Sequence, residues 1–139
     1  MARPRRRHAG SPITLTDWSL DGKFLYYMKQ DYSASYARNP SIGSLWRSPI
    51  GGGDEIRILE SLIARSFEVV EDGIYFTAPG QSADTLLQFY TFATKKTTLI
   101  GAFKKPVGGL IDVSPDRRSI LYTQLDEAGG DLMLVEGFR

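Results

Sequence analysis

The side chains best suited to chemistry in this sequence are three aspartates at repeat-like intervals. Asp21, Asp72 and Asp116 lie 51 and 44 residues apart. Carboxylates perform acid–base catalysis when they converge on one substrate. Each of these aspartates, however, follows an apolar, strand-like segment, and the first two stand beside glycine. Because tight turns select aspartate and glycine, we expect all three to be turn residues.

Nucleophilic and metal-dependent chemistry has little support elsewhere in the chain. His8 is the single histidine and lies among the basic residues at the start, and there is no cysteine. The chain therefore has no thiol nucleophile, disulfide or thiolate metal site, and we expect neither a Ser-His-Asp triad nor a histidine metal site. The sequence predicts no catalytic residue, no metal site and no cofactor, and a protein that is not an enzyme.

Two further clusters have structural explanations. Glu68, Glu71 and Asp72 offer oxygen ligands for calcium, but side chains alternate between the two faces of a strand and would not converge. The three glycines at positions 51–53 are not followed by Lys-Ser/Thr and do not open a helix, so they indicate a hairpin turn and not a phosphate loop. Solvated loops explain the short basic pairs at 95–96, 104–105 and 117–118.

Aromatic side chains are the remaining candidates for recognition. Tyr32 and Tyr36 lie in a long polar segment between Gln30 and Gly43, which we expect to be a loop. Together with Trp46 they can line an interface, because amphipathic aromatics favour binding surfaces. Trp46 also fits a core position in a strand. The sequence leaves this choice open and does not identify the binding residues.

The elements that position these residues are short alternating strands separated by turns. No segment keeps an apolar period of 3.6 residues over three turns, so we expect almost no helix. Aromatic residues make up 12% of the chain and favour strands. The predicted strands cover residues 15–20, 23–28, 45–50 and 55–59, then 67–70, 74–78, 86–92 and 97–100, and finally 110–113, 119–123 and 131–135.

The strands recur as internal repeats. The turn aspartates align as above, and Trp46, Tyr90 and Met133 align the third strands at spacings of 44 and 43 residues. A period of about 40 to 50 residues with four strands is typical of β-propeller blades. We predict an all-β chain of about three four-stranded antiparallel blades, the last incomplete. The partial propeller spans residues 12–139, with blades near 12–60, 64–101 and 107–139.

Two of the repeats carry a family resemblance. Residues 18–27 (WSLDGKFLYY) and 113–122 (VSPDRRSILY) resemble the WD40-like repeats of the TolB type, in which a strand leads through Ser-Pro-Asp-Gly to a strand ending in aromatics. The first copy has Leu20 in place of proline, and the third has Arg117 in place of glycine. The middle copy keeps only Asp-Gly and the aromatics.

The resemblance implies a function as well as a fold. Residues 131–139 are similar to the last blade of propellers appended to bacterial transcriptional regulators and Ser/Thr kinases. We therefore expect a non-catalytic module that binds a protein, a peptide or another ligand, as the sensory or interaction part of a regulator. The alternative is a fragment of the gating propeller of a prolyl-oligopeptidase-type serine peptidase, which would need a hydrolase domain carrying Gly-x-Ser-x-Gly.

Incomplete closure has consequences for partners. A closed propeller has at least four blades, so the open ends should expose an unpaired strand and an apolar face. We expect either self-association or further blades from a longer chain, besides an unidentified protein or peptide partner.

Charge and the first residues narrow the remaining classes. Without the four arginines at positions 3, 5, 6 and 7, 13 basic residues face 16 acidic ones, a formal charge of −3. A mildly acidic body is a poor nucleic-acid surface. Residues 1–11 are expected to be a disordered basic leader. Because no apolar segment follows this leader, we do not expect it to direct secretion. The cytoplasm is therefore the favoured location, unless the chain belongs to a membrane-anchored parent protein. No apolar run is long enough for membrane insertion.

Overall fold

The regular structure of this protein consists entirely of β-strands. The computed structural model describes residues 13–30, 42–82, 84–126 and 129–138, and every helix or strand among them is a strand. The expected all-β class is thus confirmed. The predicted leader at residues 1–11, with His8, lies outside the described residues, as do Tyr32 and Tyr36.

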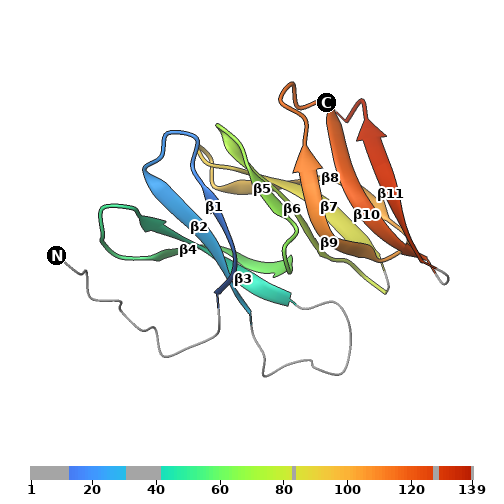
Figure 1. The fold of residues 1–139 in the computed structure, drawn as a ribbon, viewed down its shortest axis with the longest axis horizontal. Coiled ribbons are helices and arrows are strands. Elements are labelled where there is room, and N and C mark those ends of the chain that lie inside the picture. Colours follow the sequence, from blue (N-terminus) through green and yellow to red (C-terminus); the bar gives the residue numbers. More distant parts are fainter. Residues whose placement is uncertain (1–12, 31–41, 83, 127–128, 139) are drawn as a thin grey trace.

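The strands form three antiparallel sheets, each built from consecutive strands of the chain (Figure 1). We call these sheets blades 1, 2 and 3. Blade 1 contains β1 (Ile13–Trp18), β2 (Phe24–Gln30), β3 (Ile42–Pro49) and β4 (Ile56–Ile63); blade 2 contains β5 (Phe67–Val69), β6 (Gly73–Pro79), β7 (Thr85–Thr91) and β8 (Lys96–Phe103); blade 3 contains β9 (Val107–Val113), β10 (Ser119–Asp126) and β11 (Gly129–Glu136).

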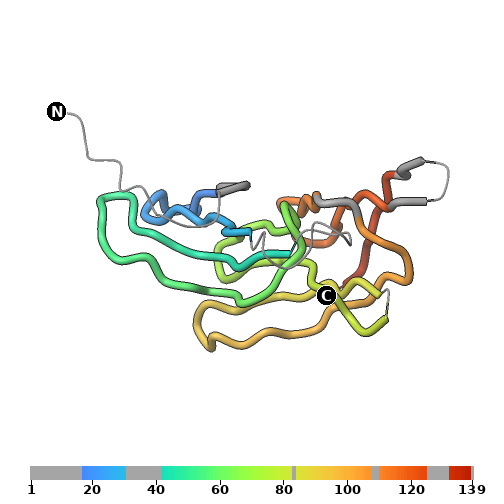
Figure 2. Tube along the Cα trace, turned by 90° about the horizontal axis from the view of Figure 1, so that it is seen from below, coloured from blue at the N-terminus to red at the C-terminus, as the bar shows by residue number. Residues whose placement is uncertain are grey.

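The blades follow one another along the long axis of the molecule (Figure 2). Their first strands contact each other in series, β1 with β5 and β5 with β9. Strand β4 of blade 1 also contacts β6 of blade 2, so blades 1 and 2 meet along more than their first strands. We call the face of a blade that looks toward the next blade its rear face, and the opposite face its front face.

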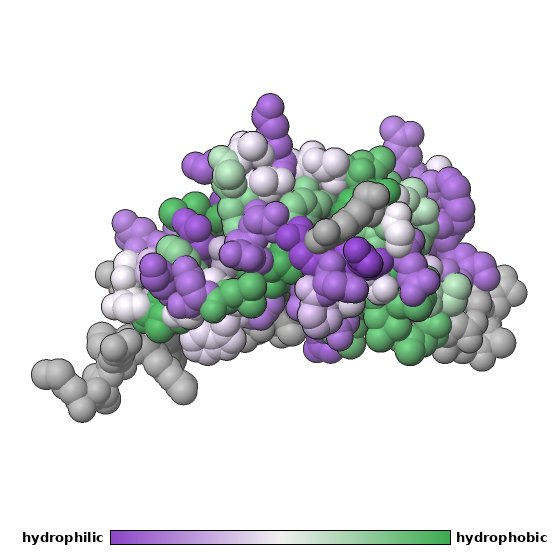
Figure 3. Space-filling view, turned by 90° about the horizontal axis from the view of Figure 1, so that it is seen from above, coloured by the Kyte–Doolittle hydropathy of each residue, from purple (hydrophilic) through white to green (hydrophobic). Residues whose placement is uncertain are grey.

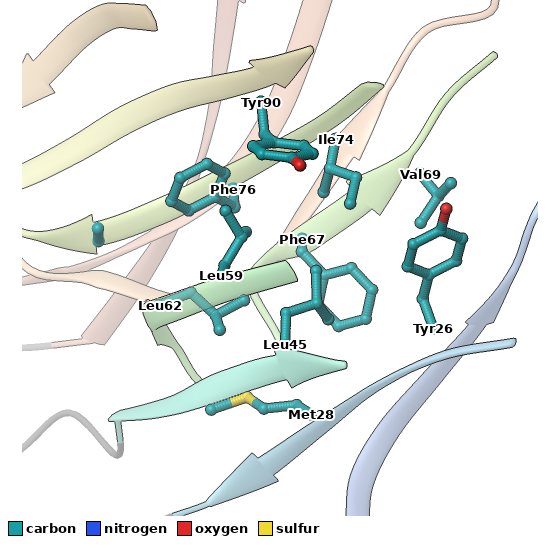
Figure 4. Packing of buried hydrophobic residues seen from close by; sticks show 11 residues of the cluster. Tyr26, Met28, Leu45, Leu59, Leu62, Phe67, Val69, Ile74, Phe76 and Tyr90 are labelled. Atoms are coloured by element: carbon teal, nitrogen blue, oxygen red, sulfur yellow. The ribbon is translucent and has the colours of Figure 1, made fainter. Parts of the chain in front are cut away.

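Blades 1 and 2 enclose the larger hydrophobic core. The rear face of blade 1 contributes Tyr26, Met28 and Leu45, all at most 2% exposed, and the front face of blade 2 contributes Ile74 and Phe76. Figure 4 shows these side chains converging between the two sheets. Because burial of apolar area stabilises a fold by roughly 25 cal/mol per Å², this core is the main attachment of blade 1.

Blades 2 and 3 enclose a second core. Tyr75 and Leu87 from the rear face of blade 2 pack against Ile111, Ile120 and Tyr122 from the front face of blade 3. Strand β6 thus contributes to both cores, with Ile74 and Phe76 on one side and Tyr75 on the other. Its alternation of large apolar residues on both faces is the sequence pattern of a strand buried between two neighbours.

The strand register defines equivalent positions in the three blades. The last residue of each first strand pairs with an equivalent residue of the second strand: Trp18 with Leu25, Val69 with Ile74, and Val113 with Ile120. The next residues of the second strands therefore also correspond. They are Tyr26, Tyr75 and Leu121 on the rear faces, followed by Tyr27, Phe76 and Tyr122 on the front faces. The predicted alignment of Trp46, Tyr90 and Met133 is wrong at its middle member. Tyr90 lies opposite Ile74, whereas Trp46 and Met133 lie opposite the front-face aromatics Tyr27 and Tyr122.

The error arises from the turn that precedes β6. Ser19 and Ser114 bond across turns of four residues to Phe24 and Ser119, but Val70 bonds Gly73 across a turn of two residues. An Asp-Gly pair occurs at both the β1–β2 turn and the β5–β6 turn, so residue type did not reveal that the second turn is two residues shorter. Blade 2 is therefore two residues shorter at the edge of the molecule where the β1–β2, β5–β6 and β9–β10 turns lie.

The rear face of blade 3 is apolar and exposed. Leu121 and Leu134 form a cross-strand pair at 37% and 57% exposure, and Leu110 and Leu132 are exposed at 58% and 65%. Among the described residues, no strand pairs with the outer edge of β11. The third blade thus has three described strands, as predicted.

Candidate binding site between blades 1 and 2

A cavity of about 660 Å³ opens between blades 1 and 2, at the edge of the molecule where the β1–β2 and β5–β6 turns lie. Blade 1 supplies its β1–β2 turn and the start of β2, and blade 2 supplies its short β5–β6 turn. Figure 3 shows this edge of the molecule, where hydrophilic and hydrophobic surface alternate. The lining residues are Ser19, Leu20, Asp21, Phe24, Tyr26, Arg47, Val70, Glu71 and Phe92.

An arginine and three aromatic residues contribute to the lining of this cavity. Arg47 lies opposite Tyr26 on β3, and its guanidinium stands 4.3 Å from the centre of the Phe24 ring. Phe92 stacks on Tyr26 with 6.0 Å between ring centres. Burial raises the pKa of the Tyr26 hydroxyl, although a hydrogen bond with Arg47 opposes this shift. The wall thus offers flat apolar surface beside a fixed cation.

Two carboxylates, one from each blade, also line the cavity. Asp21 Oδ1 accepts hydrogen bonds from Ser19 Oγ at 2.6 Å and from the Lys23 amide at 3.0 Å. These bonds, that of Ser19 first, lower the pKa of Asp21, so it is ionised at neutral pH. Glu71 is exposed in the two-residue turn across the cavity. Together with Arg47, the lining carries a formal charge of −1.

The equivalent place between blades 2 and 3 is filled by an arginine from the chain itself. Arg117, in the four-residue β9–β10 turn, donates to Asp72 Oδ1 at 2.6 Å and to the Tyr75 hydroxyl at 3.2 and 3.3 Å. Its guanidinium also lies 5.5 Å and 5.3 Å from the ring centres of Tyr75 and Phe89. Burial alone would lower the pKa of Arg117, but the bonds to Tyr75 and Asp72 outweigh it and raise the pKa.

The predicted turn aspartates are thus placed at turns, but they are not alike. Asp116 accepts from Ser114 Oγ and the Arg118 amide, as Asp21 does from its own turn. Asp72 instead pairs with Arg117 of the next blade. Arg47 was not predicted from the sequence, because a single basic residue in a strand gives no motif. Arg117 was expected to be a solvated loop residue, whereas its guanidinium bridges two blades.

A row of carboxylates lies on the first strands. The register gives Asp17, Glu68 and Asp112 equivalent positions, and Asp17 Oδ2 accepts from the Val69 amide of the next blade at 3.2 Å. Burial, reinforced by the charges of Asp17 and Asp112, raises the pKa of Glu68 to about 7. Among the described residues, no three His, Asp or Glu side chains are grouped so that they could hold a metal ion.

Trp46 belongs to the front face of blade 1 and not to a core between blades. The Lys29 ammonium stands 3.9 Å from the centre of the Trp46 ring, and Trp46 Nε1 donates to Ser44 Oγ at 2.8 Å. Glu55 accepts from both Lys29 and the Tyr27 hydroxyl. This face therefore carries a polar network, whereas the rear face of blade 3 presents leucines.

Comparison with known proteins supports the architecture. No protein-family model and no curated protein matches the chain. Among solved structures, it is similar to the β-propeller domain of the trilobed protease from Pyrococcus furiosus, described as having an open velcro topology, with a TM-score of 0.52 and 17% sequence identity. The match covers 90% of this chain and 41% of that chain. It shows the fold, and the chain is accordingly made of β-propeller blades and spans less than half of that structure.

No helix in the described part of the chain is long and apolar enough to cross a membrane.

Proposed function

We propose that this chain is a non-catalytic β-propeller module that binds a protein or peptide segment in the cavity between blades 1 and 2. The cavity itself is the observation that carries the proposal. Its volume of about 660 Å³ falls in the range of ligand sites, and it combines apolar walls with a few polar groups. Arginine, here Arg47, is enriched among the residues that dominate binding energy.

The wider setting of this proposal rests on the repeats. Residues 18–27 and 113–122 follow the TolB-type pattern of strand, Ser-x-Asp turn and aromatic-ended strand, which supports a place in a bacterial regulator as its sensory or interaction part. The described turns agree with that pattern, because Ser19 and Ser114 each bond the aspartate two residues further on. The mildly acidic body favours a protein partner over nucleic acid.

Peptide selection on the whole chain tests this function. Displayed random peptides would be selected on the purified protein and their affinities measured by titration calorimetry. Leu20→Trp should weaken the selected peptides about tenfold or more, because Leu20 is exposed at the cavity wall and a larger ring there obstructs it. Leu99→Trp, on the exposed outer strand of blade 2, is the matched control. Equal affinity in both variants contradicts the proposal.

A second candidate is part of the gating propeller of a serine peptidase. The similarity to a propeller domain of a protease is the observation that favours it. A gate lets peptides pass without holding them, whereas a binding module retains them. Selected peptides with dissociation constants below about 100 μM would support the module, and a selection that yields no retained peptide would support the gate.

A further inference from the structure

Strand β11 forms the outer edge of blade 3, at the end of the row of blades (Figure 1). In blades 1 and 2 the third strand, β3 or β7, pairs on its outer side with a fourth strand, β4 or β8. No described strand pairs with β11 in this way. The outward backbone N–H and C=O groups of β11 are therefore placed as an extended chain needs them for strand addition.

The edge of β11 lacks the features that protect the other outer strands. Natural sheets block unwanted pairing at an edge with bulges, lysine or proline. The pairing of β4 with β3 has two irregularities and that of β8 with β7 has one, and exposed Arg57, Glu60 and Lys96 lie on these outer strands. By contrast, β11 pairs with β10 without an irregularity, and residues 129–136 include no lysine, arginine or proline. This edge is therefore open to pairing.

Large apolar side chains occupy both faces of β11. Leu132 and Leu134 on the rear face are 65% and 57% exposed, and Met133 on the front face is 36% exposed. The register places Leu132 at the position of Leu45 in β3 and Leu87 in β7, which are 0% and 1% exposed. Both of those leucines have a fourth strand beside them. An added strand with apolar side chains would therefore cover part of β11 as β4 and β8 cover their neighbours.

The fourth strand of blade 2 indicates which charge fits beside β11. Lys96 of β8 lies opposite Thr91 of β7, and Glu136 is the equivalent of Thr91 in blade 3. Glu136 is exposed, and no ion pair among the described residues joins it to a cation. Opposite charges that face each other across two strands stabilise their pairing. A basic residue at the position of Lys96 would thus complement Glu136.

We propose that an extended peptide segment of a partner protein pairs antiparallel with the outer edge of β11 and forms the fourth strand of blade 3. The segment has a basic residue opposite Glu136 and apolar residues opposite Leu134 and Leu132. Main-chain hydrogen bonds provide the affinity of such strand addition, and alternate side chains provide its selectivity. This site is separate from the cavity between blades 1 and 2 and goes beyond the peptide binding proposed there.

A capped peptide of sequence Lys-Thr-Val-Thr-Val-Thr tests the proposal on the full chain. In the antiparallel register its lysine lies opposite Glu136, and its two valines lie opposite Leu134 and Leu132. Titration calorimetry should give a dissociation constant of about 10 to 100 μM. A chain that does not bind this peptide at up to about 1 mM would refute the proposal.

Backbone methylation distinguishes strand addition from nonspecific apolar contact. Two versions of the peptide carry N-methyl groups, one on the amides of lysine and both valines and the other on the amides of the threonines. Because successive amides of a strand point to opposite sides, only one of these sets faces β11. One version should lose measurable binding and the other should keep its affinity within about threefold. Equal affinities of the two versions would contradict pairing with an edge.

A charge exchange locates the peptide on β11. Glu136→Lys should weaken the peptide about threefold or more, and replacing the peptide's lysine with glutamate should restore its affinity to this variant. Glu60→Lys, at an exposed position of the outer strand β4, is the matched control and should leave the affinity unchanged. Circular dichroism shows whether each variant is folded. An equal effect of the two lysine variants would overturn the proposal.

The cavity variant separates this site from the proposed function. Leu20→Trp obstructs the cavity between blades 1 and 2 and should leave the affinity of this peptide unchanged. Loss of binding in Leu20→Trp would assign the peptide to the cavity and refute a site at β11. Binding that persists in Leu20→Trp and is weakened by Glu136→Lys supports the site, whether or not peptides bind the cavity.

Discussion

The interface between blades 1 and 2 and the interface between blades 2 and 3 solve the same packing problem differently. Both have large apolar cores, but the first ends in a cavity and the second is closed by Arg117. The two interfaces also differ in the first turn of the later blade, which is two residues shorter at the first interface. In this repeat protein, the cavity lies where one blade departs from the others, because the side chains at positions shared by all blades pack against the neighbouring blade.

Removing the rear-face tyrosines should give the largest effect and the clearest contrast. Tyr75→Ala should lower the free energy of unfolding by about 3 to 5 kcal/mol, because Tyr75 packs against Phe89 and Phe138 and binds Arg117. Tyr26→Ala should cost less, about 2 to 3 kcal/mol, because the aromatic ring that Tyr26 packs against is Phe92 and its hydroxyl bonds Arg47 of its own blade, so no bond to the next blade is lost. Urea unfolding of both variants measures the difference. A larger loss for Tyr26 than for Tyr75 would reverse the comparison.

Gly73 marks the start of the strand that both interfaces share. A Cβ atom there would lie 2.1 Å from the Tyr90 carbonyl oxygen and 2.4 Å from the Phe89 ring. Gly73→Ala should therefore destabilise the protein by about 3 kcal/mol, at the upper end for overpacking. Gly101→Ala, in β8 with no heavy atom within 4 Å of its Cβ, is the control and should change stability by less than about 1 kcal/mol. Similar melting curves for the two variants would contradict the tight approach of β6 to β7.

Arg117 should contribute measurably to the closed interface. Arg117→Ala should lower the free energy of unfolding by about 2 kcal/mol, because it removes a charge-assisted bond to Asp72 and leaves the Tyr75 hydroxyl without its donor. Arg118→Ala, at the exposed neighbouring position, should have an effect within about 0.5 kcal/mol. The two variants are compared by urea unfolding at low and high salt. An effect of Arg117→Ala no larger than that of Arg118→Ala would show that the guanidinium is solvated.

Glu68, on the first strand of blade 2, should make the free energy of unfolding depend on pH. Its pKa is raised from 4.5 in the unfolded chain to about 7 in the folded one, by burial first and then by Asp17 and Asp112. The folded state therefore holds the proton more tightly, and the stabilisation present below about pH 4.5 is lost as the pH rises through 7.

Glu68→Gln removes this titration. The variant should gain about 1 to 2 kcal/mol relative to the wild type at pH 8, allowing for screening by solvent, and little at pH 5. Thermal or urea unfolding at the two pH values measures the gain. A gain that is equal at pH 5 and pH 8 would show that Glu68 titrates normally.

The exposed leucines of blade 3 should affect association and not stability. Leu121 stands where Tyr26 and Tyr75 are covered by a following blade, so we expect a second copy of the chain to cover the rear face of blade 3. Leu134→Asp should then convert a self-associating protein of twice 15.5 kDa or more into a monomer, with stability changed by less than about 0.5 kcal/mol. Leu99→Asp has the same 57% exposure and should leave the mass unchanged. Light scattering measures the mass of each variant in solution. A wild-type monomer at micromolar concentration would contradict the expectation.

The fold was largely predictable from the sequence because its pattern is local. Alternation along β6, the Asp-Gly turns and the repeat period are properties of consecutive residues, and they predicted the sheets and the incomplete third blade. The alignment through Tyr90 failed because residue type was used in place of hydrogen-bond register, and a two-residue deletion is invisible to that comparison.

The candidate site was much less predictable. Tyr26 was recognised as a repeated aromatic and Asp21 as a turn residue, but neither property says that a cavity lies between them. The cavity depends on Arg47, Glu71 and Phe92, which come from three different hairpins and meet only when two blades pack. The closing role of Arg117 likewise depends on its reach across a blade boundary, which no property of residues 113–122 alone reveals.

The order of the strands has a consequence for the newly made chain. Every sheet forms from consecutive strands, so blade 1 can pair its strands as soon as residue 63 has left the ribosome. Its buried Met28 and Leu45 nevertheless have no cover until Phe76 and Tyr90 of blade 2 have also emerged. At about 5 to 20 residues per second, that interval lasts a few seconds. Cellular chaperones that recognise apolar surface can therefore bind each blade during the interval before the next blade has been synthesised.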